Sequence, residues 1–497
     1  MTVSLLNSTE LQQLKERYEA NGQGHVFRFY ESLNEEQQAQ LVKQLVELDV
    51  ERLNVIYRKA IEGAEAALLS QDAKLEPLSD SVFDSVLKAS PEQLKEWETV
   101  GLTNIAEGKV AVILMAGGQG TRLGSSDPKG CYNINLPSQK SLFQLQAERI
   151  LRVQDLARQY KKAGGECIIP WYIMTSGPTH RPTYEFFEKN QFFGLKKENV
   201  IFFEQGTLPC LTMDGKIILE AKEKVAMAPD GNGGIYAAVV NKGVIQSLKE
   251  RGILYSHCYC VDNCLARVAD PVFIGYSVSK GTDCGVKVVS KASPEEPVGV
   301  VCVRDGKYGV VEYSEISQEV SERRQQDGSL QFGAANIANH FFSTEFLERV
   351  PQFADQLEYH IAKKKIKYVD EEGQVIVPKS NSGMKLECFV FDVFSFAQNF
   401  SVLEVDRKEE FSPLKNAPGS GADCPETSRR DIVAQHVRFV EAAGGKVAGG
   451  DDYENLAFEI SPWISYSGEG LVEYVAGKTL EPTVIETKQD LIRSAHV

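Results

Sequence analysis

A glycine-rich loop that directly follows an apolar strand is the feature that most constrains the fold of this chain. Residues 110–116 form a continuous apolar run, which is typical of a strand buried on both faces of a parallel sheet. The segment LMAGGQGTRLGSSDPKG, residues 114–130, overlaps its end. Glycines let the backbone pass close to a ligand, and their N–H groups can point at phosphates. The pattern therefore indicates a phosphate-binding loop at the end of a strand.

This loop differs from the two best-known nucleotide-binding motifs. Counted from Gly118, the third position of a GxGxxG fingerprint is Leu123, and no GK[ST] closes the segment as in a Walker A loop. The loop instead carries the cations Arg122 and Lys129. Arginine can bind two phosphate oxygens at once, whereas lysine supplies a compact charge. We therefore expect these two side chains to bind a polyphosphate.

Further strand-like runs alternate with helical segments after the loop. They are residues 168–174, 200–203 and 255–261. This alternation predicts an α/β fold with an open, mostly parallel sheet and helices on both faces. Ligands of such folds bind beyond the carboxyl ends of the strands. Gln205 and Asp262, which come just after two of these runs, are therefore expected at the site.

The chain divides by pattern into three parts. With 497 residues it is several times the length of a usual single domain. We predict a helical N-terminal domain, a catalytic domain and a C-terminal domain, at residues 1–105, 106–400 and 401–497. The stretch 415–430, which contains several glycines and prolines, is expected to be a loop.

The first 105 residues carry helix signals but no cluster of catalytic residue types. Helix starts are predicted at Thr9 with Gln12, at Asn34 with Gln37 and at Ser90 with Pro91. Gly101 is expected to end the last of these helices.

Charge and composition exclude several classes of protein. Lys and Arg number 54 against 69 Asp and Glu, so the net charge is −15 and no general positive field draws the chain to nucleic acid or anionic membranes. No apolar run approaches the ~18 residues of a membrane helix, and the first residues lack a signal-peptide pattern. The ten cysteines form no CxxC pair. We therefore predict a cytoplasmic protein with reduced thiols and neither a nucleic-acid nor a membrane partner.

Further motifs connect the loop to a known family. AGGQGTRLG followed by PKG resembles sugar-nucleotide pyrophosphorylases that act on UTP. The segments FEQGTLPC, MAPDGNGGIY, YCVDN, NIANHFF, KLECFVFDVF and FSPLKNA narrow the resemblance to the eukaryotic UDP-N-acetylhexosamine (UDP-N-acetylglucosamine) pyrophosphorylases of the UDP-sugar pyrophosphorylase family. The resemblance implies a Rossmann-like nucleotidyltransferase core with a mixed, mostly parallel sheet. It also implies a helical N-terminal domain and a small α+β C-terminal domain on either side of that core.

The reaction implied by the resemblance is a uridylyl transfer in UDP-N-acetylglucosamine biosynthesis. N-acetyl-alpha-D-glucosamine 1-phosphate attacks the α-phosphate of UTP in line and displaces diphosphate; N-acetylgalactosamine 1-phosphate is a further expected substrate. The nucleophile is already an anion, so the site must hold two polyanions and neutralise charge. Two alternatives stay open: a UDP-glucose pyrophosphorylase, and a non-catalytic regulator that binds a sugar nucleotide. A homodimer is also expected.

Four residues are expected to carry the chemistry. By resemblance, Arg122 and Lys129 contact the β- and γ-phosphates, and Lys415 reaches the phosphates between nucleotide and sugar. Asp262 is expected to bind Mg²⁺ (or Mn²⁺), because Mg²⁺ takes few protein ligands and otherwise binds phosphate oxygens and water. The alternative for Asp262 is a cap of the following turn together with Asn263.

The substrate-binding residues are expected to read the base and the sugar. The carboxamide of Gln205 can match the N3–H and a carbonyl of uracil. The other positions implied by the resemblance are Gly117, Gly118, Gly231, Asn232, Gly299, Glu312, Tyr313, Asn336, Lys385, Phe389 and Phe391. Tyr313, Phe389 and Phe391 suit an N-acetyl methyl group. Phe389 and Phe391, together with NIANHFF, favour the N-acetyl sugar over glucose, mainly through the resemblance. The alternation of Phe389 and Phe391 also fits ordinary core packing in a strand.

Overall fold

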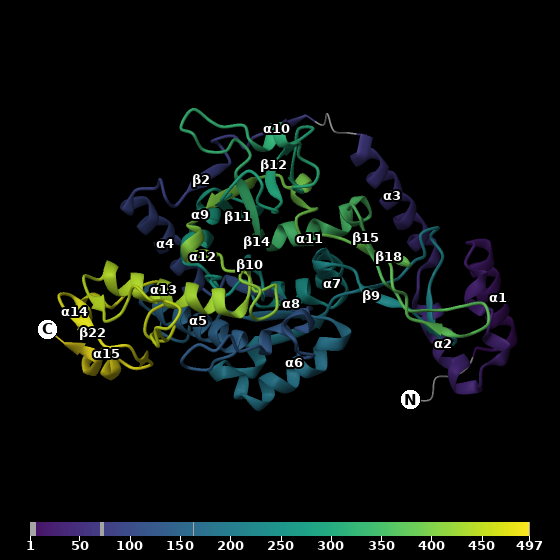
Figure 1. The fold of residues 1–497 in the computed structure, drawn as a ribbon, viewed down its shortest axis with the longest axis horizontal. Coiled ribbons are helices and arrows are strands. Elements are labelled where there is room, and N and C mark those ends of the chain that lie inside the picture. The colour runs from purple at the N-terminus through teal and green to yellow at the C-terminus, as the bar shows by residue number, and fades with distance from the viewer. Residues whose placement is uncertain (1–5, 70–73, 163, 497) are drawn as a thin grey trace. The chain divides into compact units, whose positions relative to one another are not determined.

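The computed structural model describes residues 6–69, 74–162 and 164–496 (Figure 1). The chain packs as two compact units, each built from three separate segments. The smaller unit comprises Met1–Ala73, Gln205–Ala237 and Ala354–Asp392, and the larger one comprises Lys74–Glu204, Ala238–Phe353 and Val393–Val497. Since these units are discontinuous, the division into consecutive domains 1–105, 106–400 and 401–497 stays a prediction.

One mixed sheet forms the centre of the larger unit. Its strands lie in the order β2 (Phe83–Ser85), β19 (Phe400–Glu404), β11 (Cys284–Ser290), β14 (Ala334–Ser343), β10 (Tyr255–Cys260), β3 (Val110–Met115), β4 (Trp171–Thr175) and β5 (Val200–Glu204). Neighbours along this order are parallel, except that β14 is antiparallel to both β10 and β11. Three more strands join through β14: β12 (Val300–Arg304), β13 (Lys307–Val311) and β1 (Leu75–Glu76). The predicted mixed, mostly parallel sheet is confirmed.

Helices cover the apolar strands of this sheet. Every residue of β3 and of β4 is buried, as the continuous apolar run predicts. α5 (Leu142–Ala157) contributes Phe143 and Ile150 to the same hydrophobic cluster as the strands. The other helices of this unit, up to the C-terminal region, are α4 (Pro91–Ala106), α6 (Gly177–Lys189), α8 (Val244–Glu250), α9 (Pro271–Ser279), α10 (Gln318–Ser321), α11 (Thr344–Phe353) and α12 (Arg407–Glu410).

Gly101 does not end α4, contrary to the prediction. The helix continues to Ala106, and Gly101 is buried where α4 crosses α9. A Cβ added at Gly101 would collide with the backbone of Pro271, and one added at Gly275 would collide with the carbonyl of Trp97. The glycines therefore serve a close approach of two helices and not a helix stop.

The smaller unit combines helices with short hairpins. Its helices include α1 (Ser8–Ala20), α2 (Glu35–Glu47) and α3 (Val50–Leu69), while α7 (Ile235–Asn241) begins in it. Its strand pairs are β15 (His360–Lys364) with β18 (Gly383–Glu387), β16 (Tyr368–Val369) with β17 (Val375–Ile376), β6 (Thr207–Pro209) with β9 (Met227–Pro229) and β7 (Leu219–Ala221) with β8 (Lys224–Val225). One buried cluster contains residues of α1, α2, α3 and β18.

The helix caps confirm two predictions and correct a third. Asn34 and Gln37 form the predicted capping box of α2, and Ser90 caps α4 with Pro91 in its first turn. At α1 the box is made by Asn7 and Glu10, so the prediction of Thr9 with Gln12 was wrong. The Asn7 amide donates to Glu10 Oε2 (2.9 Å), and a carboxylate at that place also interacts favourably with the positive end of the helix.

The C-terminal region has its own small core. α13 (Pro425–Ala442) begins inside the stretch 415–430, so the predicted loop ends at Cys424; a proline in the first turn suits a helix start. The remaining elements are β20 (Lys446–Val447), β21 (Glu459–Ile460), α14 (Val472–Val475), β22 (Thr479–Leu480), β23 (Val484–Ile485), α15 (Lys488–Ser494) and β24 (Ala495–His496). Nowhere in the described part of the chain does a helix have the length and apolarity that crossing a membrane requires.

Candidate active site

The predicted site residues fall into three groups, two in the larger unit and one in the smaller. The phosphate group consists of Gly117, Gly118, Arg122, Lys129, Asp262 and Lys415. The β14 group consists of Gly299, Glu312, Tyr313 and Asn336. The hairpin group, in the smaller unit, consists of Gln205, Gly231, Asn232, Lys385, Phe389 and Phe391.

The glycine loop folds back on itself beyond the carboxyl end of β3. Ser176 Oγ donates to Gly117 O (2.7 Å), and the Lys129 amide donates to Gly118 O (3.1 Å). The Gly120 amide donates to the Asp127 carbonyl (2.9 Å). These bonds place Lys129 beside the first glycines, although it comes eleven positions after Gly118 in the chain. Arg122 lies on the exposed side of the loop.

Lys129 and Asp262 meet at this edge of the sheet. Lys129 Nζ donates to Leu414 O (3.1 Å) and lies 3.6 Å from Asp262 Oδ2. The two side chains are 17% and 27% exposed, so both can be reached by a ligand. The Leu414 amide donates to Asp262 O (2.8 Å), which puts Lys415, the next residue, at the same place. These bonds bring Lys129, Asp262 and Lys415 together at the edge of the sheet, while their expected contacts with phosphates and metal stay predictions.

Asn263, and not Asp262, caps the turn after β10. Asn263 Oδ1 accepts from the Leu265 amide (3.2 Å), while the Asp262 carboxylate faces Lys129. Among residues 6–69, 74–162 and 164–496, no group of three or more His, Cys, Asp and Glu side chains is arranged to hold a metal ion. A lone, partly exposed carboxylate suits a hard cation that takes its other ligands from phosphate and water.

A β-bulge brings the β14 group together. The register between β11 and β14 shifts at Lys287/Val288, and Ala338 adopts a φ of 52°. Asn336 Oδ1 accepts from the Ala338 amide (3.1 Å), so the bulge and this side chain support each other. Because β14 is antiparallel to β10, its amino end lies at the edge of the sheet where Asp262 follows β10.

Gly299 and Glu312 complete this group. The Asn336 amide donates to Gly299 O (2.9 Å). A Cβ on Gly299 would stand 3.2 Å from Glu312 Oε1, which places the carboxylate directly over the glycine. Tyr313 is 54% exposed, and its predicted place beside an acetyl methyl group stays a prediction.

The hairpin group surrounds a pocket of about 390 Å³ within the smaller unit. Its lining consists of Pro229, Gly231, Asn232, Lys385, Glu387 and Phe389. Gln205 Nε2 donates to Gly231 O (3.2 Å), and Asn232 Oδ1 accepts from the Val390 amide (3.0 Å). Gly231 has a φ of 87°, and a Cβ there would collide with the Cys388 carbonyl, so this position requires glycine.

The two phenylalanines lie in a turn and not in a strand. β18 ends at Glu387, before Phe389 and Phe391. The Phe389 ring stacks on His360 with centroids 4.3 Å apart and lies 5.2 Å from the ring of Phe391. Both rings are partly exposed, which leaves an apolar surface beside the polar lining of the pocket.

Sequence reasoning did not select two carboxyl groups of this region, Asp230 and Glu387. Burial raises the pKa of Asp230 to about 6, although a hydrogen bond from Gln205 acts in the opposite direction. Asp230 stands within the motif MAPDGNGGIY, yet its chain neighbours give no sign of this burial. Glu387 follows Lys385 by two residues on β18. Residues two apart in a strand point to the same face, so the proposed contact at Lys385 was a signal that could have identified Glu387.

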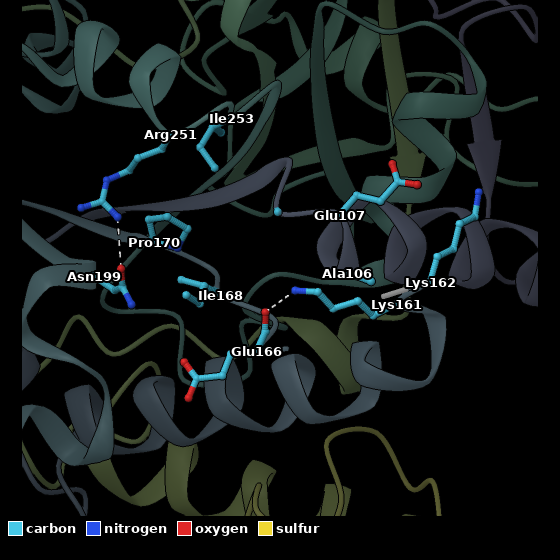
Figure 2. Close-up of a pocket in the computed structure, with 11 residues that line it drawn as sticks. Ala106, Glu107, Lys161, Lys162, Glu166, Ile168, Pro170, Asn199, Arg251 and Ile253 are labelled. Atoms are coloured by element: carbon cyan, nitrogen blue, oxygen red, sulfur yellow. Dashed lines mark hydrogen bonds between the residues drawn. The ribbon is translucent and has the colours of Figure 1, made fainter. Parts of the chain in front are cut away.

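A larger cavity, of about 500 Å³, lies at the opposite edge of the sheet (Figure 2). Pro170, Asn199 and Ile253, in its lining, come just before β4, β5 and β10. Figure 2 shows Arg251 bonded to Asn199 (3.1 Å) and Lys161 bonded to the Glu166 carbonyl. Helices α4 and α8 end at this edge, and cations compensate the negative ends of helices. None of the predicted site residues lines the cavity.

Comparison with known proteins places this geometry among sugar-nucleotide enzymes. A family model described as UTP–glucose-1-phosphate uridylyltransferase matches residues 55–420. The chain is 47% identical over 496 residues to the human UDP-N-acetylhexosamine pyrophosphorylase-like protein 1, with 96% of this chain and 97% of that protein covered. It is 44% identical over 479 residues to UDP-N-acetylglucosamine diphosphorylase 2 of Arabidopsis thaliana, with 94% and 92% covered. The crystal structure of the uridine diphosphate N-acetylglucosamine pyrophosphorylase from Trypanosoma brucei, in complex with an inhibitor, matches with a TM-score of 0.80, 32% identity and 95% of both chains covered.

Proposed function

The chain belongs to the UTP–glucose-1-phosphate uridylyltransferase family, and from this we propose that it converts UTP and N-acetyl-alpha-D-glucosamine 1-phosphate to UDP-N-acetylglucosamine and diphosphate. The observation that carries the proposal is the convergence of Lys129, Asp262 and Lys415 beside the glycine loop. Relatives that match over nearly the whole chain, and are named for UDP-N-acetylglucosamine, support the choice of sugar.

The arrangement suits the transfer of a uridylyl group from diphosphate to a sugar phosphate, both of which are anions. The phosphate of the sugar attacks the α-phosphorus of UTP, the bond to the β-phosphate breaks, and diphosphate leaves with its electron pair. The attacking oxygen is already anionic, so the chain need not supply a general base. Arg122 and Lys129 would neutralise the charge that develops on the leaving diphosphate, and Lys415 would hold the sugar phosphate in line.

Asp262 is the residue that we propose to hold Mg²⁺ or Mn²⁺. Its carboxylate is partly exposed and stands at the carboxyl end of β10, where the phosphates of a bound nucleotide would supply further oxygen ligands. Such an ion, when bound, neutralises phosphate charge and orients the two substrates.

Base and sugar recognition are assigned to the other two groups. Gln205, next to Gly231 and Asn232, would contact uracil and ribose, with Gly117 and Gly118 packed against the uridine. Gly299, Glu312, Asn336 and Lys385 would contact the sugar phosphate, while Tyr313, Phe389 and Phe391 would surround the acetyl methyl group. N-acetylgalactosamine 1-phosphate, which differs in the orientation of one hydroxyl, is proposed as a further substrate.

Diphosphate release from UTP tests the function. The purified chain is incubated with UTP, Mg²⁺ and one of three sugar 1-phosphates, of N-acetylglucosamine, N-acetylgalactosamine or glucose. We expect release with N-acetylglucosamine 1-phosphate to exceed release with glucose 1-phosphate. The reverse order would identify a UDP-glucose pyrophosphorylase. Binding of the UDP-sugar without any turnover would identify a non-catalytic sugar-nucleotide-binding protein.

We also propose a cytoplasmic location. All ten cysteines are free, as expected of a protein in a reducing compartment. Burial raises the pKa of most of their thiols, for example that of Cys210 to about 11, which keeps them unreactive. The homodimer stays a prediction.

A further inference from the structure

Two loops at the phosphate group run side by side as a short antiparallel ladder. One loop follows β10 and the other follows α12. The Leu414 amide donates to Asp262 O (2.8 Å), and the Cys264 amide donates to Ser412 O (2.9 Å). Asp262 therefore stands in this ladder, and Lys415 comes directly after it, so anything that fixes the ladder also fixes the spacing of these two charged residues.

The side chain of Asn263 connects the two loops inside the protein. It is 3% exposed. Its Nδ2 donates to Glu410 O (2.7 Å), and its Oδ1 accepts from the amides of Ser412 (3.0 Å) and Leu265 (3.2 Å). The group therefore donates to one loop and accepts from both. An apolar side chain in its place would leave three buried backbone groups without partners, which is costly.

Buried ion pairs hold Glu410, the residue to which Asn263 donates, in place. Lys287 of β11 is fully buried and forms ion pairs with Glu410 and with Asp270 (2.5 Å), the residue that caps α9. Arg267 lies 4.0 Å from the Glu410 carboxylate, so two cations balance two carboxylates. Because β11 belongs to the central sheet, the ion pair with Lys287 holds Glu410 against a rigid element. The hydrogen bond from Asn263 to Glu410 O then fixes the ladder relative to Glu410.

We infer that Asn263 is a positioning residue that sets the place of Asp262 and Lys415 for the uridylyl transfer proposed above, on which this inference rests. Lys129 is included in the same arrangement, since its ammonium donates to Leu414 O (3.1 Å) in the ladder. Asn263 carries no charge and acts through these neighbours. A displacement of about 1 Å at reacting groups is enough to cost roughly 10²-fold in rate.

The variant Asn263→Leu keeps the size of the side chain and removes its hydrogen bonds. We expect it to lower kcat by roughly 10- to 100-fold and to raise the Mg²⁺ concentration needed for half-maximal activity. Gln23→Met is the matched control. Gln23 is also 3% exposed and also bridges two backbone groups, donating to Gly215 O (2.9 Å) and accepting from the Ile217 amide (2.9 Å). Both variants should lose thermal stability, but only Asn263→Leu should alter kcat and the metal titration.

Asn263→Asp provides a second variant. It retains the two accepted hydrogen bonds but sets a carboxylate oxygen against Glu410 O in place of the donating Nδ2 group, so we expect kcat to fall below the wild-type value here too. The inference is overturned if either Asn263 variant folds and keeps the wild-type kcat and metal titration, or if Gln23→Met loses kcat equally. A wild-type chain without uridylyl transfer would overturn the proposed function itself, which is a separate outcome.

Discussion

Lys129 Nζ lies 3.6 Å from Asp262 Oδ2, so the cation assigned to phosphate and the carboxylate assigned to metal face each other. Each neutralises the other, which limits the cost of keeping two charges partly buried. A nucleotide that arrives with a divalent ion offers both groups new partners of opposite charge. Lys129 and Asp262 can therefore separate when such a ligand binds without leaving either charge unpaired.

Loss of either loop cation should slow turnover. We expect Arg122→Ala and Lys129→Ala each to reduce kcat by roughly 10²-fold or more, since charge stabilisation of the leaving diphosphate is lost. Steady-state diphosphate release measures this. Arg181→Ala is the control, because Arg181 is exposed on α6 and pairs with Glu185 in its own helix. Wild-type turnover in both loop variants would refute their role.

Removal of the Asp262 carboxylate should remove the response to metal. In Asp262→Ala we expect activity to be nearly abolished and no longer to rise with Mg²⁺, because the proposed protein ligand of the ion is gone. The measurement is initial rate against Mg²⁺ concentration. A titration curve that overlays that of the wild type would place the metal ligand elsewhere.

Gln205 should affect one substrate more than the other. Its carboxamide donates to Gly231 O, and both residues are assigned to uridine. We expect Gln205→Ala to raise the KM for UTP clearly more than the KM for N-acetylglucosamine 1-phosphate. Equal changes in both KM values contradict the uracil assignment.

The crossing of α4 and α9 should tolerate no side chain larger than glycine. We expect Gly101→Ala to destabilise the fold by about 1–3 kcal/mol, since its Cβ would meet the backbone of Pro271. Gly63 of α3 has open space around a Cβ, and Gly63→Ala should gain stability by up to about 1 kcal/mol from helix propensity. Thermal unfolding of both variants measures the contrast. A Gly101→Ala variant as stable as the wild type would show that the crossing is not tight.

Two buried histidines should make the fold sensitive to acid. Burial lowers the pKa of His257 to about 4 and that of His340 to about 3. Above the usual value near 6.5, both are neutral in the folded and unfolded chain, and their full contribution to stability is present. As the pH falls below about 6.5, protons favour the unfolded chain, by about 1.4 kcal/mol per pH unit and histidine, until the folded pKa is reached.

Urea unfolding at pH 7 and pH 5 measures this dependence, and His340→Leu tests its source. Neither ring nitrogen of His340 has a hydrogen-bond partner in the part of the chain that the structure describes, so the substitution leaves little unpaired. We expect the variant to lose less stability between the two pH values than the wild type. An unchanged pH dependence would show that His340 does not contribute.

Local pattern was enough to predict the central sheet and the place of the glycine loop after its first buried strand. The apolar run at residues 110–116 became β3, and the positions of Lys129 and Asp262 follow from the rule that ligands bind at the carboxyl ends of strands. Both signals depend on residues close together in sequence. The predicted ends of elements were less accurate, as the strand expected from residue 168 begins at Trp171.

Features that depend on distant partners could not be predicted. Gly101 looks like a helix stop until α9 is packed against it. The role of Asn263 depends on Glu410, and that of Glu410 depends on Lys287, none of which are neighbours in the chain. The raised pKa of Asp230 likewise reflects burial by segments that only the folded structure brings together.

The reversed direction of β14 also bears on how relatives with this fold diverge. Residues 291–333 connect β11 to β14. Since β14 begins at the edge of the sheet where β10 and β11 end, this connecting segment starts and ends at that edge. Insertions or replacements in the parts of this segment outside β12 and β13 would remodel the surroundings of Gly299, Glu312 and Tyr313 without disturbing strand pairing. Selection can thus change the accepted sugar while the machinery for the nucleotide is inherited intact.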